Sequence, residues 1–331
     1  MDHTPTRGVT LRSPTSLLVR SSLILLLGAV TSACSGDVPA PNGAGAPAAG
    51  ASAPGAPAVS ADSFAAYWYG GLAELTGYRL TQARYGALRE GTATLIYVTE
   101  PFSRRRHVKV DDIDRAGDDA VTVLKVNATR EFVTGIYPYS MMTSVFTPVN
   151  VGDRTLKVTT SSQEWCGHTY TQLNRASRGW RLRAFSYFES EADRSLAIAD
   201  VWLEDEVWTA IRLDPASLPI GGVRMLPSTI YQRLSHTPFE PQEAIGRLDA
   251  DTTAGDLRGY TVEYPSLGRT LSIRFRGDFP HEVEGWEETY LDGGEMLTTR
   301  AVATGRQRLA YWELNRPGDE VWRDSLGAAS N

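Results

Sequence analysis

From Gly77 onward, apolar and polar residues alternate along the chain, and this alternation constrains the fold most strongly. β-Branched and aromatic residues recur at every second position, and Gly, Asp, Asn and Pro separate the runs. This pattern is typical of half-buried strands joined by turns. It predicts strands near residues 78–86, 91–100, 105–110, 121–128, 132–139, 142–149, 155–163, 164–174, 179–189, 222–235, 257–264, 268–276, 281–291, 296–303 and 307–314. We therefore expect a mainly β fold: a strongly curved antiparallel sheet or half-open barrel, or two packed sheets, with one or two short helices.

Two segments depart from the strand pattern. Residues 62–76 predict a short helix that the glycine pair at 70–71 breaks or kinks. Residues 205–212 predict one or two helical turns, which Asp214-Pro215 ends. The surrounding segment, 190–221, is expected to be a connector packed against one end of a sheet, and it is where the β-rich domain 62–331 would subdivide.

The N-terminus has the features of a bacterial lipoprotein signal peptide, predicted for residues 1–33. Three arginines precede the apolar run 23–30, which is far shorter than the roughly 20 residues of a membrane span. Small residues then lead to Cys34, as in a lipobox, although Thr31 stands where that motif usually has Leu. We expect Cys34 to be lipidated and to become the mature N-terminus. The alternative is ordinary cleavage that leaves Cys34 as a free thiol.

The lipid-anchored segment 34–61 consists almost wholly of Ala, Pro, Gly and Ser. This composition predicts a disordered linker between the membrane and the folded domain. Ser35 and Gly36 follow the cysteine in place of Asp, which indicates an outer-membrane lipoprotein that faces the periplasm.

The net charge of the whole chain is −6, and it becomes −8 when residues 1–33, with three Arg and one Asp, are removed. An acidic chain argues against a nucleic-acid-binding protein. The chain has only two cysteines, so Cys166 alone remains beside the anchor, which excludes an intramolecular disulfide framework and a multi-cysteine zinc site. The sequence predicts no cofactor and no metal.

Residues 155–174 contain the one group of side chains that could carry catalysis. If 164–174 is a strand, Glu164, Cys166 and His168 share one face, and a thiol beside an imidazole could act as nucleophile and base. Alternatively, Cys166 is a small buried residue of the core. Metal ligation by the three side chains is a third reading, although ligands along one strand rarely surround a tetrahedral ion. Gly167 between them indicates that another strand or a ligand approaches closely.

Ligand-binding candidates lie in two further segments. Residues 132–149 are rich in Tyr, Met, Ser and Thr, which suits a groove for an apolar or mixed ligand, or simply alternating strands with one buried face. The basic run 103–109 could contact phosphate groups, or it is a solvated loop. The predicted ligand-binding residues are Trp165, Tyr137, Tyr139, Met141, Met142 and Arg105.

Residues 78–88, 132–149 and 161–174 resemble a family of uncharacterised bacterial lipoproteins, some of which carry the label "septum formation inhibitor Maf". The resemblance extends over most of the mature domain. Cytoplasmic Maf nucleotide pyrophosphatases have a Ser-Pro-Arg-Arg stretch. The run 103–106 here lacks the proline, so the resemblance does not imply that activity. The run of hairpins also looks like the half-open barrels of periplasmic lipid carriers.

These observations predict a non-enzymatic envelope lipoprotein that binds a lipid-like ligand or an envelope protein partner, with the membrane reached through Cys34. The alternative is a thiol-dependent hydrolase or redox enzyme that uses Cys166 and His168. A structural role in envelope assembly is a third hypothesis.

Overall fold

The computed structural model describes residues 60–150, 152–251 and 256–327. The predicted signal peptide, Cys34 and most of the linker lie outside these residues. The helices and short 3-10 turns are α1 (Ala61–Trp68), α2 (Ile113–Ala116), η1 (Gly117–Asp119), η2 (Glu204–Glu206), α3 (Val207–Leu213), η3 (Pro215–Ser217), α4 (Thr229–Ser235), η4 (Pro265–Leu267), η5 (Tyr311–Glu313) and α5 (Val321–Asp324). The strands are β1 (Ala73–Arg84), β2 (Ala87–Ser103), β3 (Ala120–Thr134), β4 (Tyr137–Pro148), β5 (Lys157–Glu164), β6 (Gly167–Ala176), β7 (Gly179–Ser186), β8 (Arg194–Ile198), β9 (Trp202–Leu203), β10 (Gly221–Leu226), β11 (Gln242–Asp251), β12 (Leu257–Tyr264), β13 (Arg269–Arg276), β14 (Val283–Asp292) and β15 (Glu295–Leu309).

All fifteen strands form one open, mixed sheet in the order β8-β7-β6-β5-β4-β3-β2-β1-β15-β14-β13-β12-β11-β10-β9. Only β9 and β10 run parallel. β1 and β15 are the first and last strands in the sequence, and they are neighbours in the sheet. β1 pairs with β15 from Ala73↔Leu309 to Thr81↔Arg300. The prediction of a mainly β fold is therefore confirmed, and so is the meander of hairpins near the C-terminus, which is β12–β15.

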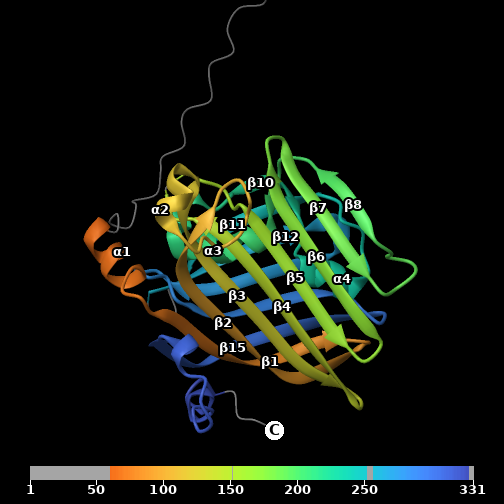
Figure 1. Cartoon of the computed structure of the whole chain (residues 1–331). Helices are drawn as coiled ribbons and strands as arrows, with labels where there is room; N and C mark the ends of the chain where they lie inside the picture. The colour runs from red at the N-terminus through yellow and green to blue at the C-terminus, as the bar shows by residue number, and fades with distance from the viewer. Residues whose placement is uncertain (1–59, 151, 252–255, 328–331) are drawn as a thin grey trace, which may run out of the picture. The chain divides into compact units, whose positions relative to one another are not determined.

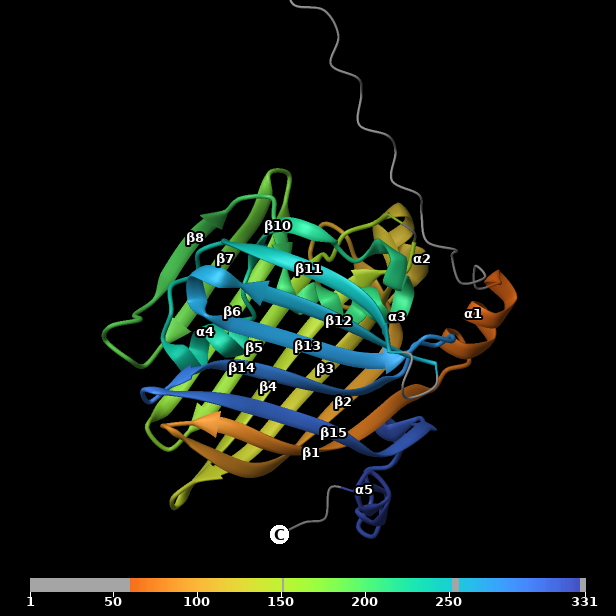
Figure 2. The same cartoon turned by 180° about the vertical axis from the view of Figure 1, so that it is seen from behind.

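The strand order divides the sheet into two halves, β1–β8 and β9–β15. Helices α3 and α4 lie between these halves, behind β3–β6 in Figure 1 and behind β11–β13 in Figure 2. The Trp208 carbonyl of α3 accepts a hydrogen bond from Tyr97 of β2 at 3.1 Å, and the Trp208 ring meets Trp286 of β14 at 5.3 Å. On α4, the Tyr231 ring meets Tyr290 of β14 at 5.5 Å. The two helices therefore fill the space between the sheet halves, and they join both halves in one core.

The 205–212 helix is confirmed, and Pro215 follows its end as expected. Its expected position is wrong, since α3 is buried inside the core rather than packed on one end of a sheet. Core residues come from both sides of the 190–221 segment.

Several predicted boundaries are wrong. The N-terminal helix breaks at the glycine pair 70–71, as predicted, but it does not continue to residue 76: α1 ends at Trp68, Gly71 takes a left-handed φ of 72°, and the chain then enters β1. Residues 105–110 form a loop. The predicted strand 132–139 contains the turn at Gly135 that joins β3 to β4. The predicted strand 222–235 ends at Leu226 and is followed by α4, while β11 was not predicted at all.

Charged side chains are buried between the helices and the sheet. Arg269 of β13 donates to both carboxylate oxygens of Glu204, at 2.5 and 2.6 Å, and to Glu288 of β14 at 2.8 Å. Arg130 of β3 lies 3.4 Å from the same Glu288. The Arg269 side chain is completely inaccessible to solvent. This cluster links the neighbouring strands β13 and β14 to the distant strand β3 and to η2.

A second buried pair fixes α3 to β1. Arg212 donates to both oxygens of Glu74 at 2.6 Å, and Tyr67 of α1 also donates to Glu74. Bidentate geometry of this kind is the strongest form of an arginine–carboxylate contact. Both clusters lie between the helices and the sheet, and the cavity beside Arg130 and Trp208 has a volume of only about 20 Å³.

Candidate functional site

The hairpin between β5 and β6 changes the geometry of the predicted catalytic group. Glu164 pairs with Gly167, so Trp165 and Cys166 form a two-residue turn. The Glu164 carboxylate accepts the Cys166 backbone N–H at 2.6 Å, which stabilises that turn. The prediction of one strand over 164–174, with Glu164, Cys166 and His168 on one face, is therefore wrong.

Cys166 is exposed rather than buried in the core. A hydrogen bond to Glu164, together with burial and the negative charge of that carboxylate, raises the pKa of the Cys166 thiol. A higher pKa lowers the fraction of the nucleophilic thiolate. Within the hairpin 157–176, no hydrogen bond joins Cys166 to His168, which is itself exposed. The arrangement therefore does not activate the thiol.

Replacing Glu164 by Gln is expected to increase the alkylation rate of Cys166 severalfold at pH 8, because the carboxylate that raises the thiol pKa is removed. Iodoacetamide labelling followed by peptide mass spectrometry measures this rate for Cys166 separately from Cys34. Glu131→Gln, on β3 and outside contact with the thiol, serves as the control. An unchanged or lower rate in Glu164→Gln would contradict the assigned role of Glu164.

Gly167 is the site of a close approach, as the sequence indicates, and the approaching group is an aromatic ring. A Cβ atom at Gly167 would lie 2.6 Å from Cδ1 of Tyr187 in the β7–β8 loop. Tyr187 thus lies over the start of β6. The loop 187–193 is placed beside the β5–β6 hairpin by this contact.

Three of the predicted ligand-binding residues come together. The Tyr137 ring lies 6.3 Å from Trp165 and 5.9 Å from Tyr139. Tyr139 also shares a hydrogen bond of 2.9 Å with Tyr85 at the end of β1, and Arg84 lies over the Tyr85 ring at 3.9 Å. These aromatic residues come from three hairpins at one end of the sheet.

The other three predicted ligand-binding residues lie elsewhere. Met141 is a buried core residue, because odd-numbered residues of β4 face the helices. Met142 lies on the opposite, outer face of the same strand. Arg105 lies in the β2–β3 loop at the other end of the sheet and pairs with Asp119 at 3.1 Å. These three side chains do not join Trp165 and Tyr137 in one site.

A cavity of about 150 Å³ lies beside the β5–β6 hairpin. We call it the α4 pocket. Its walls combine apolar side chains, hydroxyls and four ionisable residues. They come from β6, β7, the 187–193 loop, α4 and the segment 236–239: Thr169, Thr171, Ala184, Phe185, Ser186, Ser190, Glu191, Ala192, Arg194, Gln232, Arg233, His236, Thr237, Pro238 and Phe239.

Arg233 is the central charged residue of this pocket. Only 7% of its side chain is exposed, and its guanidinium lies over the Phe188 ring at 4.7 Å. Glu164 and Glu191 lie 3.7 and 3.5 Å from it, too far for hydrogen bonds. Its Nε and Nη1 atoms have no hydrogen-bond partner. Buried donors of a charged group are rarely left unpaired, because their desolvation then has no compensation.

The 187–193 loop is tied to the end of α4 by Glu191. Its carboxylate accepts a hydrogen bond from Ser186 at 2.8 Å and lies 2.7 Å from Nδ1 of His236. Burial opposes ionisation of Glu191, but these two contacts and the Arg233 charge together lower its pKa. Glu191 is therefore an ionised wall of the pocket at neutral pH.

Sequence reasoning missed this pocket because it assigned residues 222–235 to a strand. Capping signals do mark α4: the Ser228 hydroxyl accepts the Tyr231 N–H, and His236 closes the helix at a φ of 54° two residues before Pro238. Ser at the N-cap and Pro beyond the end are recognised helix boundaries.

A larger cavity, of about 220 Å³, lies between the β4–β5 segment and α3. Its cation, Arg154, is fully engaged. It donates to both oxygens of Glu206, at 3.0 and 3.2 Å, and lies 4.3 Å over Trp202. The arginine of this cavity is therefore already hydrogen-bonded to a carboxylate, unlike Arg233 of the α4 pocket.

Two further features are relevant to the site. Among residues 60–150, 152–251 and 256–327, no group of three or more His, Cys, Asp and Glu residues is arranged to hold a metal ion. No helix in the described part of the chain is long and apolar enough to span a bilayer.

Comparison of the sequence with models of protein families gives no match, and neither the curated proteins nor the solved structures contain a significant match. A functional assignment therefore depends on the geometry of the α4 pocket and on the sequence features described above.

Proposed function

We propose that this protein is an envelope lipoprotein that binds, without catalysing a reaction, the acidic head group of a lipid-like ligand in the α4 pocket. The observation that carries the proposal is Arg233, a buried cation with two unpaired N–H groups at the wall of a cavity. Such N–H groups donate their strongest hydrogen bonds to an anionic oxygen.

The walls of the pocket suit an amphipathic ligand. Arg194 and Arg233 supply positive charge, which Glu191 in the wall and Glu164 beside Arg233 balance, while Phe185 and Phe239 supply apolar contacts. Small-molecule sites commonly combine apolar walls with a few convergent polar groups. A cavity of about 150 Å³ holds a head group or a short chain, because pockets that enclose whole drug-sized ligands occupy roughly 300–1,000 Å³.

Binding requires a small rearrangement. The free nitrogens of Arg233 are covered by residues of the 187–193 loop, which carries Phe188 and Glu191. An entering phosphate or carboxylate replaces Glu191 beside Arg233, and Glu191 keeps its contact with His236. The loop therefore shifts outward when the ligand binds.

We further propose that the open sheet is a strongly curved half-barrel. Its interior is occupied by α3, α4 and the buried ion pairs, so the ligand binds at the end of the sheet rather than inside it. The N-terminal features support a lipid on Cys34, a flexible linker and a position at the periplasmic face of the outer membrane. The alternative is that the protein binds an envelope protein, rather than a lipid-like ligand, at the same end of the sheet.

Octyl phosphate is the test ligand, with octanol as the uncharged molecule of equal chain length. By calorimetry, we expect octyl phosphate to bind more tightly than octanol, and Arg233→Gln to weaken its binding roughly 10- to 100-fold, the equivalent of losing charged hydrogen bonds. The matched control is Arg224→Gln, which alters an exposed arginine on β10 and should leave binding unchanged.

Equal affinities for octyl phosphate and octanol would show that no anion site exists. Unchanged binding by Arg233→Gln, with thermal unfolding confirming a folded chain, would place the site elsewhere. Mass spectrometry of organic extracts from gently purified protein then identifies the natural ligand.

A further inference from the structure

One end of the sheet carries large apolar side chains at the tips of successive hairpins. The turns β1–β2, β3–β4, β5–β6, β7–β8, β12–β13 and β14–β15 share this end, because antiparallel strands place every second turn together. Two contacts support this arrangement. The Gly86 N–H in the β1–β2 turn donates to Asp292 beside the β14–β15 turn at 2.5 Å, and Tyr187 of the β7–β8 loop lies against Gly167. In Figure 1 these turns lie toward the right and lower right.

We define the tip rim as the six exposed residues at these turns: Tyr85, Ile136, Trp165, Tyr187, Leu291 and Met296. Ile136, Tyr187 and Trp165 are the most exposed of them, at 82%, 74% and 69%. Single exposed apolar residues are normal. Hairpin turns, however, favour Gly, Asn, Asp and Ser, and here five of the six turns carry an exposed large apolar or aromatic side chain in the turn or directly beside it.

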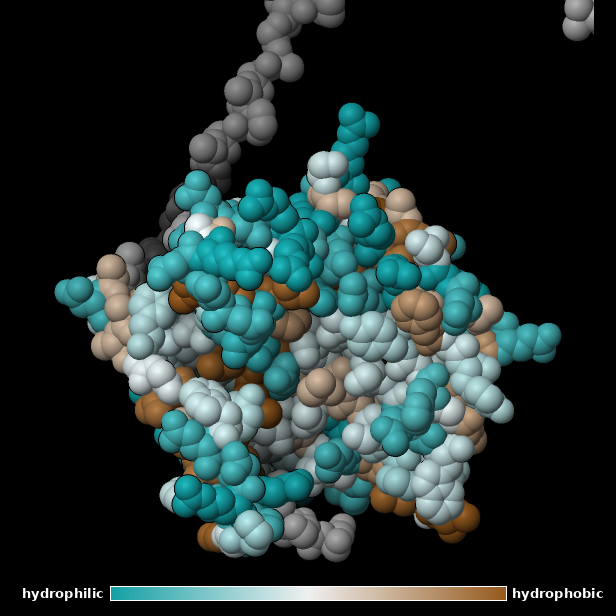
Figure 3. Space-filling model, viewed as in Figure 1, coloured by the Kyte–Doolittle hydropathy of each residue, from teal (hydrophilic) through white to brown (hydrophobic). Residues whose placement is uncertain are grey.

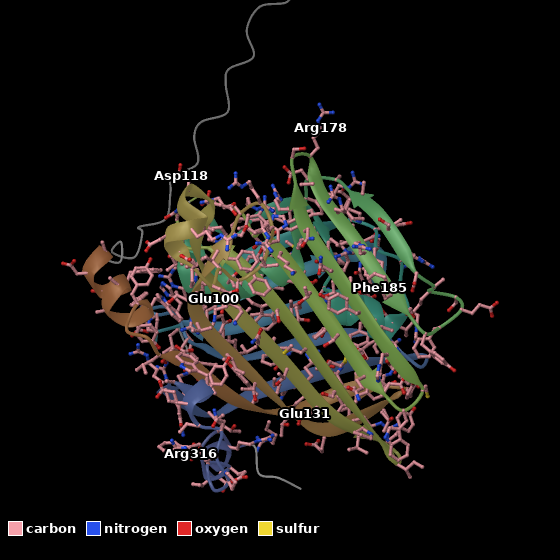
Figure 4. All side chains as sticks on the ribbon, viewed as in Figure 1. Glu100, Asp118, Glu131, Arg178, Phe185 and Arg316 are labelled. Carbon is pink, nitrogen blue, oxygen red and sulfur yellow. The ribbon has the colours of Figure 1, made fainter. Side chains whose placement is uncertain are left out.

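The opposite end of the sheet has a different character. Its loops carry the basic run 103–109 and the acidic residues of α2 and η1. Figure 4 shows Asp118 and Arg178 projecting from that end, and Figure 3 shows hydrophilic side chains gathered over it, with hydrophobic atoms at the lower right edge around the β3–β4 hairpin. The three most exposed large apolar side chains of the described residues thus lie at the tip end, although Tyr69, Ile113 and Ile220 are also exposed at the opposite end.

We propose that the tip rim docks on a lipid bilayer surface made of neutral lipids. Trp and Tyr together with aliphatic residues are the side chains that occupy the boundary between head groups and acyl chains. The rim consists of separate protruding tips, which can each enter a fluid surface, whereas a dimer interface needs one continuous complementary patch. Exposed Glu90, Glu131, Glu189 and Glu295 lie near the tips, and they oppose binding to anionic lipids.

The position of the N-terminus is compatible with this docking. β1 begins at the end opposite the tip rim and α1 precedes it. The chain has 27 residues from Cys34 to Ser60, enough for about 90 Å when extended. The lipid anchor, which belongs to the proposed function, therefore allows the distant rim to reach the same membrane. The α4 pocket opens beside the 187–193 loop, so docking brings it close to lipid head groups.

Vesicle flotation tests the inference. The processed chain, residues 34–331, carries Cys34→Ser so that no lipid is attached, and it is mixed with phosphatidylcholine vesicles. We expect it to float with the vesicles, and the triple variant Ile136→Ser, Trp165→Ser, Tyr187→Ser to lose at least about 10-fold in partitioning. The matched control Tyr69→Ser, Ile113→Ser, Ile220→Ser changes residues of 52–60% exposure at the opposite end and should float normally.

A second measurement does not depend on folding of the triple variant. Brominated phosphatidylcholine should quench part of the tryptophan fluorescence, and Trp165→Phe should remove that quenched part. Absence of flotation, equal loss in the rim and control variants, or a requirement for phosphatidylglycerol would each overturn the proposal. Sedimentation as a dimer that only the rim variant dissociates, without vesicle binding, would instead identify a contact between two copies. Arg233→Gln should float normally, which separates rim docking from the α4 pocket.

Discussion

Replacing Arg269 by Met is expected to lower the free energy of unfolding by about 3–5 kcal/mol at pH 7, the usual effect of breaking a buried ion pair on one side. Arg269 is fully buried, and it neutralises both Glu204 and Glu288. Without it, Glu204 has no cation within reach and Glu288 keeps only Arg130 at 3.4 Å. The uncompensated charges, rather than lost packing, cause the loss of stability, since Met fills much of the same volume.

Urea unfolding of the wild type and the variant at several pH values checks this result. Burial opposes ionisation of Glu288, but the Arg269 and Arg130 charges lower its pKa. A lowered pKa contributes stability above the ordinary range of Glu, near 4.3, and this contribution disappears as the pH falls below it. The difference between wild type and variant should therefore shrink in acid.

The exposed pair Arg247–Glu263 is the control, because its side chains are 51% and 39% exposed. Arg247→Met should change stability by less than about 1 kcal/mol. Adding Glu204→Gln and Glu288→Gln to Arg269→Met should restore part of the lost stability. A loss that persists unchanged in the triple variant would show that packing, not charge, explains the effect.

Much of the fold follows from alternation in the sequence, and so does the inward position of these charges. In β13, Arg269 has the same parity as Leu271, Ile273 and Phe275, and all four are buried. In β14, Glu288 shares parity with Trp286 and Tyr290. Alternation thus places an arginine and a glutamate on the buried face of neighbouring strands, which predicts a buried ion pair.

Where local pattern and tertiary environment disagree, the sequence was less informative. α4 is seven residues long, and its Ile230, Tyr231 and Leu234 suit a strand as well as a helix. Short apolar segments carry this ambiguity, and here burial between the sheet halves decides the outcome. The turn at Trp165 and Cys166 lacks the Asn-Gly or Asp-Gly signal of a two-residue hairpin, so the pattern predicts a boundary between strands 155–163 and 164–174 that lies before the turn rather than at it.

The candidate site was predictable only in part, for the same reasons. Trp165 and Tyr137 were expected to belong together, and the hairpin tips do bring them to 6.3 Å. Arg233 was not predicted as a binding residue, because its burial depends on α4 and on the loop that covers it. A buried cation without hydrogen-bond partners is a property of three-dimensional packing, and no spacing in the sequence encodes it.

Asp205 is the second buried carboxylate of η2, directly after Glu204. It accepts hydrogen bonds from the backbone N–H and the hydroxyl of Thr229, at 3.1 and 3.0 Å. Burial, with a further contribution from the Glu204 charge, outweighs these contacts and the Arg269 charge and raises the pKa of Asp205 to about 7. The folded chain therefore holds a proton on Asp205 in slightly acidic solution, where the unfolded chain does not.

Asp205 should make the protein less stable as the pH rises from about 4 to 7, because the folded state binds the extra proton over that interval. Each pKa unit corresponds to about 1.4 kcal/mol, so a rise from the ordinary 3.8 to about 7 corresponds to on the order of 4 kcal/mol at full ionisation. Asp205→Asn, which resembles the protonated acid, should match the wild type near pH 4 and exceed its free energy of unfolding by up to this amount at pH 8.5. Urea unfolding at both pH values measures the difference, and Asp118→Asn, on the exposed η1 turn, is the control. If Asp205→Asn has the same effect at both pH values, Asp205 does not carry a raised pKa.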